Sequence, residues 1–255
     1  MTELEDKLAL ARKNRAGWDA ASDDYQSEHS DDLTGDKALA WGIWRLPESE
    51  LRILGDMAGK DVLELGCGQA EWSLELARKG ARSVGLDNSG ARLRFARQHQ
   101  RREGVLFPLV QASAEIAPFR NESFDVVFCD YGALTFLPPE RSIPEVARLL
   151  RPGGLLAFTT THPLLWCSWP PGADEAAPEL VRDYFSIYSE EEDGIVDFNL
   201  PLGEWVRVFV RHGLAIEDLV EVQPPEGATT TYGGRPLTWA RRWPAEMIWK
   251  VRKPA

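Results

Sequence analysis

The middle of the chain alternates between short apolar runs and stretches with helical spacing. The apolar runs predict five strands, at residues 61–65, 82–87, 105–110, 124–129 and 155–160. Helices are predicted between them, at residues 70–79, 90–102 and 139–151. Strands that alternate with helices predict a parallel sheet with helices on both faces, and such sheets bind ligands at the carboxyl ends of their strands.

The N-terminal part of the chain departs from this alternation. Leu4, Leu8 and Ala11 keep a helical period, a second helical run covers residues 48–57, and residues 31–36 form a polar, turn-like link. We therefore predict a helical cap, or lid, over residues 1–58. Residues 59–255 are predicted to form one α/β domain.

Residues 161–200 also break the pattern, because they combine several prolines with an acidic run at 190–193. Long irregular segments inside a compact domain are usually functional or disordered. This one leaves the fifth strand at the ligand end of the sheet, so we predict a substrate-side insertion or lid. A helix at 202–212 and strands at 215–222 and 246–251 complete the predicted domain.

The charge and cysteine content narrow the classes of function. The formal net charge of −11 disfavours a nucleic acid partner, because the phosphate backbone is repelled at long range. No run approaches the ~20 apolar residues of a membrane helix, and the acidic N-terminus lacks the basic region of a secretory signal. The three cysteines are widely spaced and form no CxxC pair, which disfavours a disulfide framework and a zinc cluster. We expect a cytoplasmic protein without a metal.

The strongest chemical signal joins the first strand to the first helix of the α/β domain. Gly66 and Gly68 permit a tight turn that a ligand can approach closely, and Asp87 stands 21 positions after Gly66, at the end of the second strand. There its carboxylate can accept both hydroxyls of a ribose. A dinucleotide site requires a small residue at the sixth position of GxGxxG, where this chain has Glu71. With Glu64 before the glycines, the acidic loop suits the ammonium and sulfonium of S-adenosylmethionine better than the diphosphate of NAD.

Four segments together resemble the class I S-adenosylmethionine-dependent methyltransferases. They are residues 62–68 (VLELGCG), 85–89 (GLDNS), 124–127 (FDVV) and 150–154 (LRPGG). Within that superfamily the chain is most similar to the small-molecule group of the ubiquinone/menaquinone-biosynthesis type (methyltransferase type 11). The resemblance implies a Rossmann-like seven-stranded sheet of order 3-2-1-4-5-7-6, with strand seven antiparallel. It makes residues 59–255 the methyltransferase domain.

The resemblance also implies roles for individual residues. The backbone of Gly66, Cys67 and Gly68 would face the methionine moiety, with Glu64 nearby. Asp87 would hold the ribose, and Asn88 and Leu93 would lie near the adenine. Ser113, Ala114 and Glu115 would contact the adenine, although relatives often carry Asp where this chain has Ser113. Asp130 and Tyr131, after the fourth strand, would line the methyl-transfer site, and Tyr25 would contact the cofactor from the N-terminal segment.

His162 is the candidate general base, since it directly follows the fifth strand and an imidazole titrates near neutral pH. Its alternative role is to cap the turn before Pro163. We predict in-line methyl transfer to a small-molecule acceptor, which leaves S-adenosyl-L-homocysteine. A non-catalytic S-adenosylmethionine-binding regulator and an NAD-linked oxidoreductase are the alternatives, the second disfavoured by Glu71.

Overall fold

The structure is a computed structural model that describes residues 2–29 and 38–255. Its centre is a seven-stranded sheet with the spatial order β5-β4-β3-β6-β7-β11-β10. The strands are β3 (Asp61–Leu65), β4 (Arg82–Asp87), β5 (Leu109–Gln111), β6 (Phe124–Asp130), β7 (Leu150–Thr161), β10 (Ala215–Glu221) and β11 (Glu246–Arg252). When these seven strands are numbered 1 to 7 in chain order, their spatial order is 3-2-1-4-5-7-6. The last strand pairs antiparallel with both neighbours, which confirms the predicted fold.

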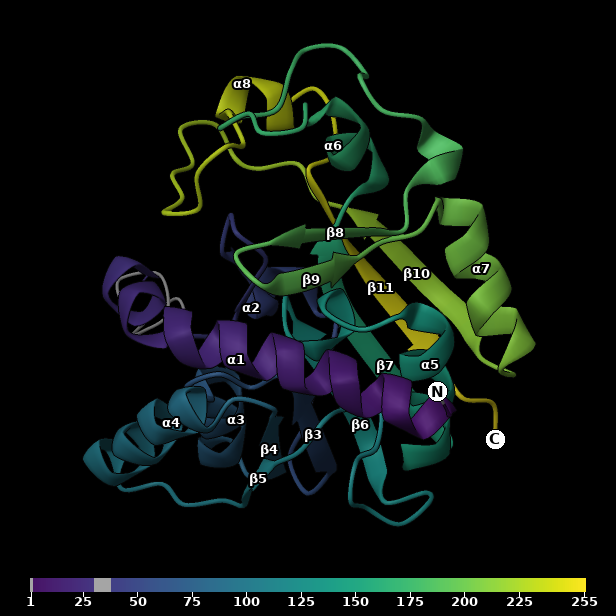
Figure 1. Ribbon diagram of the computed structural model, residues 1–255. Helices are drawn as coiled ribbons and strands as arrows, with labels where there is room; N and C mark the ends of the chain where they lie inside the picture. Colours follow the sequence, from purple (N-terminus) through teal and green to yellow (C-terminus); the bar gives the residue numbers. More distant parts are fainter. Residues whose placement is uncertain (1, 30–37) are drawn as a thin grey trace.

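Helices cover both faces of the sheet (Figure 1). They are α1 (Glu3–His29), α2 (Glu48–Leu51), α3 (Glu71–Arg78), α4 (Gly90–Glu103), α5 (Pro139–Leu149), α6 (Pro163–Ser168), α7 (Leu202–Arg211) and α8 (Leu237–Ala240). The described residues also include two single turns of 3-10 helix, Ala133–Thr135 and Tyr184–Ser186.

The central strand β6 shows how the core divides between the two faces. Val127 and Cys129 point into a cluster that includes the α5 and α7 side chains, whereas Val126 and Phe128 point into a cluster with α3 and residues 41–57. Alternate residues of a strand face opposite sides, so a strand covered on both sides reads as a continuous apolar run. The edge strand β10 is largely exposed and carries acidic side chains, which disfavours pairing with another chain.

Two predicted elements are shorter than expected, for identifiable reasons. The helix predicted at 48–57 ends at Leu51, because the Glu48 carboxylate accepts hydrogen bonds from the backbone N–H groups of Ile53, Leu54 and Gly55. These bonds replace the helical ones and leave Arg52 in a left-handed conformation (φ 52°). The strand predicted at 105–110 pairs only over Leu109–Gln111, because Pro108 has no N–H for the ladder.

The N-terminal region and the 161–200 segment pack together at the ligand end of the sheet. The long helix α1 crosses the molecule beside the hairpin of β8 (Ser189–Glu192) and β9 (Ile195–Phe198) (Figure 1). Asn14 joins them, since its side chain accepts from the Val196 N–H at 2.9 Å and donates to the Phe136 carbonyl at 2.8 Å. A short ribbon of β1 (Ala40–Trp41) and β2 (Leu46–Pro47) follows. The turn predicted at 31–36 lies outside the described residues.

Candidate functional site

The turn between β3 and α3 requires its glycines. Gly66 has φ +72°, and a Cβ there would overlap the backbone nitrogen of Ala133. Gly68 has φ +54°, and a Cβ there would lie 2.9 Å from the Arg92 Nη2 atom. Left-handed backbone and close approach both select glycine, so the turn presents bare main chain at the carboxyl ends of the strands.

Asp87, at the end of β4, is tied to the same turn. Its Oδ2 accepts from the Gly68 N–H at 2.8 Å, and its Oδ1 accepts from the Ser89 N–H at 2.8 Å. Burial raises the pKa of this carboxyl, although both backbone bonds oppose the shift. The two hydrogen bonds fix the orientation of the carboxylate against the glycine turn.

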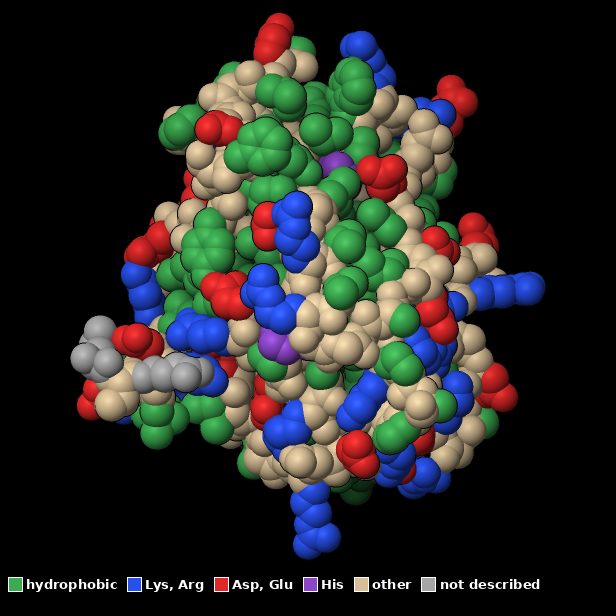
Figure 2. Space-filling view, turned by 90° about the vertical axis from the view of Figure 1, so that its right-hand side faces the viewer, with side chains coloured by type: hydrophobic (Ala, Val, Ile, Leu, Met, Phe, Trp, Pro, Cys, Tyr) green, Lys and Arg blue, Asp and Glu red, His purple; other side chains and the backbone are tan. Residues whose placement is uncertain are grey.

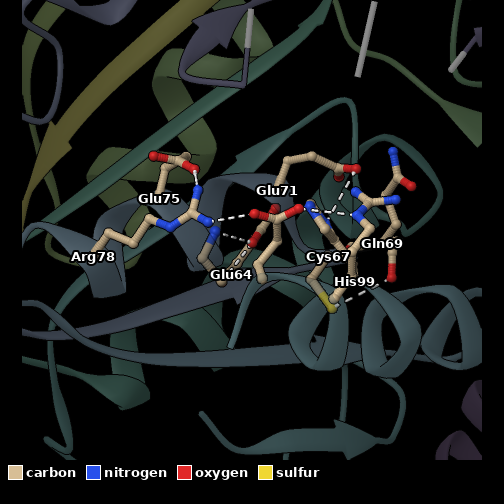
Figure 3. A network of polar contacts seen from close by, with 11 residues as sticks. Glu64, Cys67, Gln69, Glu71, Glu75, Arg78 and His99 are labelled. Atoms are coloured by element: carbon tan, nitrogen blue, oxygen red, sulfur yellow. Dashed lines mark hydrogen bonds and ion pairs between the residues drawn. The ribbon is translucent and has the colours of Figure 1, made fainter. Parts of the chain in front are cut away.

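Two more carboxyl groups lie beside the turn, as Figure 3 shows. Glu64 is buried, and its Oε2 accepts from both the backbone N–H and the hydroxyl of Ser73, at 3.0 and 2.5 Å. Glu71 is also buried, and its Oε1 has no hydrogen-bond partner among the described residues. Burial raises the pKa of each of these carboxyls to about 8. Both are therefore mainly protonated at neutral pH, and a cation bound beside them would favour ionisation.

These groups line one pocket, whose empty space of about 1000 Å³ includes a part open to solvent. Its lining combines Ser113 and Ala114 after β5, Asp87 and the glycine turn with aromatic side chains of α1 and the β6–α5 loop. Its lining residues are Ala11, Asn14, Trp18, Tyr25, Arg45, Glu64, Gly66, Cys67, Gly68, Gln69, Glu71, Trp72, Leu86, Asp87, Asn88, Arg92, Ala112, Ser113, Ala114, Asp130, Tyr131, Gly132, Ala133, Phe136 and Leu137.

Most of the residues predicted to form the site line this pocket. They are Tyr25, Glu64, Gly66, Cys67, Gly68, Asp87, Asn88, Ser113, Ala114, Asp130 and Tyr131. Two others lie outside the lining. Leu93 is fully buried and packs with Cys67, Ala70 and Ala96, behind the turn. The Glu115 carboxylate is buried and forms an ion pair with Arg141 at 2.8 Å.

His162 also lies outside the lining, and both of its ring nitrogens have protein partners. Its Nδ1 accepts from the Leu164 N–H at 3.1 Å, which caps α6, and its Nε2 is 3.0 Å from the Glu221 carboxylate. The imidazole is only 2% exposed, and burial lowers its pKa despite the neighbouring carboxylate. This geometry is that of the turn-capping alternative. The general-base role stays a prediction.

The sequence interpretation missed Arg45, which the β1–β2 turn inserts into the pocket. Its Nη1 lies 3.4 Å from the Asp130 carboxylate, and both side chains are 8% exposed. The turn is held by two carboxylates, since Asp130 accepts from the Gly42 N–H and Glu246 accepts from the Ile43 N–H, each at 2.9 Å. No local motif marks Arg45, because strand ends distant in sequence place it.

Tyr131, directly after β6, has an unusual backbone and a buried side chain. Its φ of +47° is rare for a residue with a Cβ and costs about 1–3 kcal/mol. Burial raises the pKa of its phenol well above the usual range, so the hydroxyl stays protonated. Trp18 packs edge-on against both Tyr25 and Phe136, with ring centroids 5.5 and 5.1 Å apart. This end of the pocket is therefore aromatic.

Two features are absent from the described residues. In the part of the chain that the structure describes, no helix has both the length and the apolar character needed to cross a bilayer. Over the same residues, no group of three or more His, Cys, Asp or Glu side chains is arranged to hold a metal ion.

Comparison with known proteins identifies the family. The model of the family described as "Methyltransferase domain" matches residues 63–158. The chain is 30% identical over 128 residues to a demethylmenaquinone methyltransferase of Lactococcus lactis, covering 48% of this chain but only 50% of that protein. It is 31% identical over 172 residues to a ubiquinone biosynthesis O-methyltransferase of Pseudomonas fluorescens, covering 65% of this chain and 68% of that one.

Solved structures agree on the fold. An S-adenosylmethionine-dependent methyltransferase from Mesorhizobium loti superposes with a TM-score of 0.63 at 23% identity, over 80% of this chain and 95% of that one. A Burkholderia thailandensis 1,6-didemethyltoxoflavin N1-methyltransferase, with bound S-adenosylhomocysteine, superposes with a TM-score of 0.61 at 12% identity, over 100% and 92%. The [4+2]-cyclase SpnF also shares the fold, with a TM-score of 0.64 at 19% identity over 94% and 95%. The motifs, the sheet order and the sequence relatives together show that the chain belongs to the S-adenosylmethionine-dependent methyltransferases.

Proposed function

We propose that this methyltransferase transfers the methyl group of S-adenosylmethionine to a small, planar acceptor held at the aromatic end of the pocket. The observation that carries the proposal is the continuity of that pocket, which joins the glycine turn and Asp87 to Tyr131 and the α1 side chains. In this proposal residues 59–255 form the catalytic domain. Residues 1–58 cap it, and 161–200 form its substrate-side insertion.

The cofactor half of the pocket, around the glycine turn, Asp87 and Ser113, has a complementary group for each part of a cationic nucleoside. We assign the ribose hydroxyls to Asp87, and the adenine to Asn88, Ser113 and the Ala114 backbone. The amino acid moiety would lie against the backbone of the glycine turn. There the Glu71 Oε1 atom, which lies 3.8 Å from the His99 Nδ1 atom and has no hydrogen-bond partner among the described residues, could accept from its ammonium. Arg45 is the cation placed to receive its carboxylate.

The acceptor half of the pocket, lined by Trp18, Tyr25, Tyr131 and Phe136, is suited to orient the acceptor and to exclude water rather than to supply strong acid–base groups. When bound, S-adenosylmethionine supplies a methyl carbon on a positively charged sulfur, open to in-line attack by an acceptor lone pair. The protein's main task is to hold the acceptor near that carbon and exclude water. The Tyr131 hydroxyl, which stays protonated, is suited to donate a hydrogen bond to an acceptor oxygen or nitrogen. Trp18, Tyr25 and Phe136 offer ring faces and edges to a planar molecule.

A small acceptor also fits the surface of the protein better than a nucleic acid does. On the face shown in Figure 2, Lys and Arg side chains lie among Asp and Glu side chains rather than in one continuous basic stripe. The formal net charge of −11 adds long-range repulsion of polyanions. All three cysteines are buried and free, which suits a reducing compartment, and we place the protein in the cytoplasm.

A label-transfer experiment tests the function. The protein is incubated with methyl-tritiated S-adenosylmethionine and a dialysable small-molecule extract, with Asp87→Ala as the inactive control. We expect wild-type protein to move label into a small organic product. Label in protein or nucleic acid would contradict the acceptor class.

One observation favours a second candidate, a cofactor-binding protein that methylates nothing. The fold neighbour SpnF is a [4+2]-cyclase, so this fold alone does not establish methyl transfer. Tight binding of S-adenosylhomocysteine without any label transfer would support that candidate.

A further inference from the structure

Arg92 is a buried cation inside the cofactor half of the pocket that none of the assigned roles uses. It lies in the first turn of α4, lines the pocket and is only 7% exposed. Its guanidinium lies over the Tyr25 ring at 4.5 Å from the centroid, and its Nη2 lies 2.9 Å from where a Cβ of Gly68 would be. The charge therefore lies between the N-terminal helix and the glycine turn.

No described carboxylate of residues 2–29 and 38–255 forms an ion pair with the Arg92 guanidinium within 4.0 Å. Its Nη1 atom is buried without a hydrogen-bond partner in the part of the chain that the structure describes. Nearby carboxyl groups interact with Arg92 electrostatically. Burial raises the pKa of Asp87 and of Glu71, and the charge of Arg92 lowers both pKa values by a smaller amount. A buried cation without a close partner is costly, and it affects every charged group of a ligand bound beside it.

Charged groups of both signs line the pocket. The lining includes four carboxyl groups, on Glu64, Glu71, Asp87 and Asp130, and two guanidinium groups, on Arg45 and Arg92. Because burial holds the pKa of Glu64 and Glu71 at about 8, those two are mainly neutral at pH 7. The pocket therefore combines two guanidinium groups with carboxyl groups whose ionisation burial disfavours, and it is not the uniformly acidic site that the sequence suggested.

We infer that Arg92 sets the charge selectivity of the cofactor pocket. Its positive charge disfavours the sulfonium of the methyl donor, so that the donor and the demethylated product bind with similar affinity. S-adenosylmethionine carries one more positive charge than S-adenosylhomocysteine, and the two otherwise differ by a methyl group. A cation fixed in the pocket penalises only the donor for that extra charge. The inference rests on the proposed function, because it takes this pocket to be the cofactor site.

The test compares three ligands by isothermal titration calorimetry at pH 7. They are S-adenosylmethionine, S-adenosylhomocysteine and 5′-methylthioadenosine, which has neither the sulfonium nor the amino acid group. Arg92→Met removes the charge and keeps a long side chain, whereas Arg92→Lys keeps the charge. Arg94→Met is the matched control, because it removes the same charge from an exposed position of the same helix. Thermal unfolding of each variant verifies that it is folded.

We expect Arg92→Met to increase the preference for donor over product by about tenfold, with little change in 5′-methylthioadenosine binding. Arg92→Lys and Arg94→Met should keep the wild-type preference. Equal weakening of donor and product, with 5′-methylthioadenosine unchanged, would instead mean that Arg92 pairs with the ligand carboxylate and would overturn the inference. An unchanged preference would overturn it as well. If the wild-type protein bound none of the three ligands, the proposed function itself would fail.

Discussion

The two halves of the pocket are assembled in different ways. The cofactor half comes from the carboxyl ends of three adjacent strands, β3, β4 and β5, and from the short loops that follow them. The acceptor half joins α1, the β1–β2 turn and the β6–α5 loop, and the β8–β9 hairpin is bound to α1 through Asn14. Local backbone geometry therefore defines the first half, whereas contacts between distant segments define the second. We expect substitutions in the first half to affect the cofactor and those in the second to affect the acceptor.

The largest effect is expected at Asp87, in the cofactor half. Asp87→Ala removes the carboxylate assigned to the ribose and should weaken S-adenosylhomocysteine binding by more than about a hundredfold, as loss of charge-assisted hydrogen bonds does. Calorimetry measures it, with Asp87→Asn to retain the shape and Asp218→Ala on the edge strand as the control. Unchanged affinity in Asp87→Ala would remove this residue from the site.

Arg45 tests whether the acceptor-side segments also contribute to the cofactor half. Arg45→Gln should weaken S-adenosylhomocysteine about tenfold or more, because a carboxylate loses its partner, and should leave 5′-methylthioadenosine unaffected. The same calorimetric series measures both ligands. A similar loss for the two ligands would mean that Arg45 acts by holding the β1–β2 turn rather than by binding the ligand.

A smaller effect is expected from pH. Glu64 and Glu71 have pKa values of about 8 in the ligand-free pocket, and a bound ammonium or sulfonium lowers them. Binding therefore releases protons, and the affinity for S-adenosylmethionine should rise several-fold from pH 6 to pH 8 and then level off. Calorimetry in two buffers of different ionisation enthalpy counts the protons released. The Glu71→Gln variant should release fewer protons on binding. If the wild-type protein released none, the electrostatic description would be contradicted.

The smallest effect is expected at His162, which lies outside both halves. His162→Ala removes the side-chain cap of α6 and should cost about 1 kcal/mol of unfolding free energy. If capping α6 is the whole role of His162, label transfer should remain close to wild type. If transfer were lost while the melting temperature and S-adenosylhomocysteine affinity were kept, His162 would be the general base that its position in the sequence suggests.

The same contrast explains what the sequence could predict. Gly66, Gly68 and Asp87 act through backbone conformation and strand position, which a local pattern encodes, and the sheet order follows from the family motifs. Arg45 and Arg92 could not be found in this way, because their burial depends on a distant turn and on the packing of α1. The sequence around Arg92 carries four further arginines within ten residues, a pattern typical of a solvated helix face. Glu48 ended the second helix through side-chain hydrogen bonds that helical spacing does not reveal.

A crystal structure grown with S-adenosylhomocysteine tests the central claim most directly. We predict electron density for the nucleoside with its ribose on the Asp87 carboxylate, its adenine beside Ser113 and its amino acid moiety against Gly66 and Gly68. Density at another place on the protein, or an empty pocket at saturating ligand, would contradict the assignment of this site.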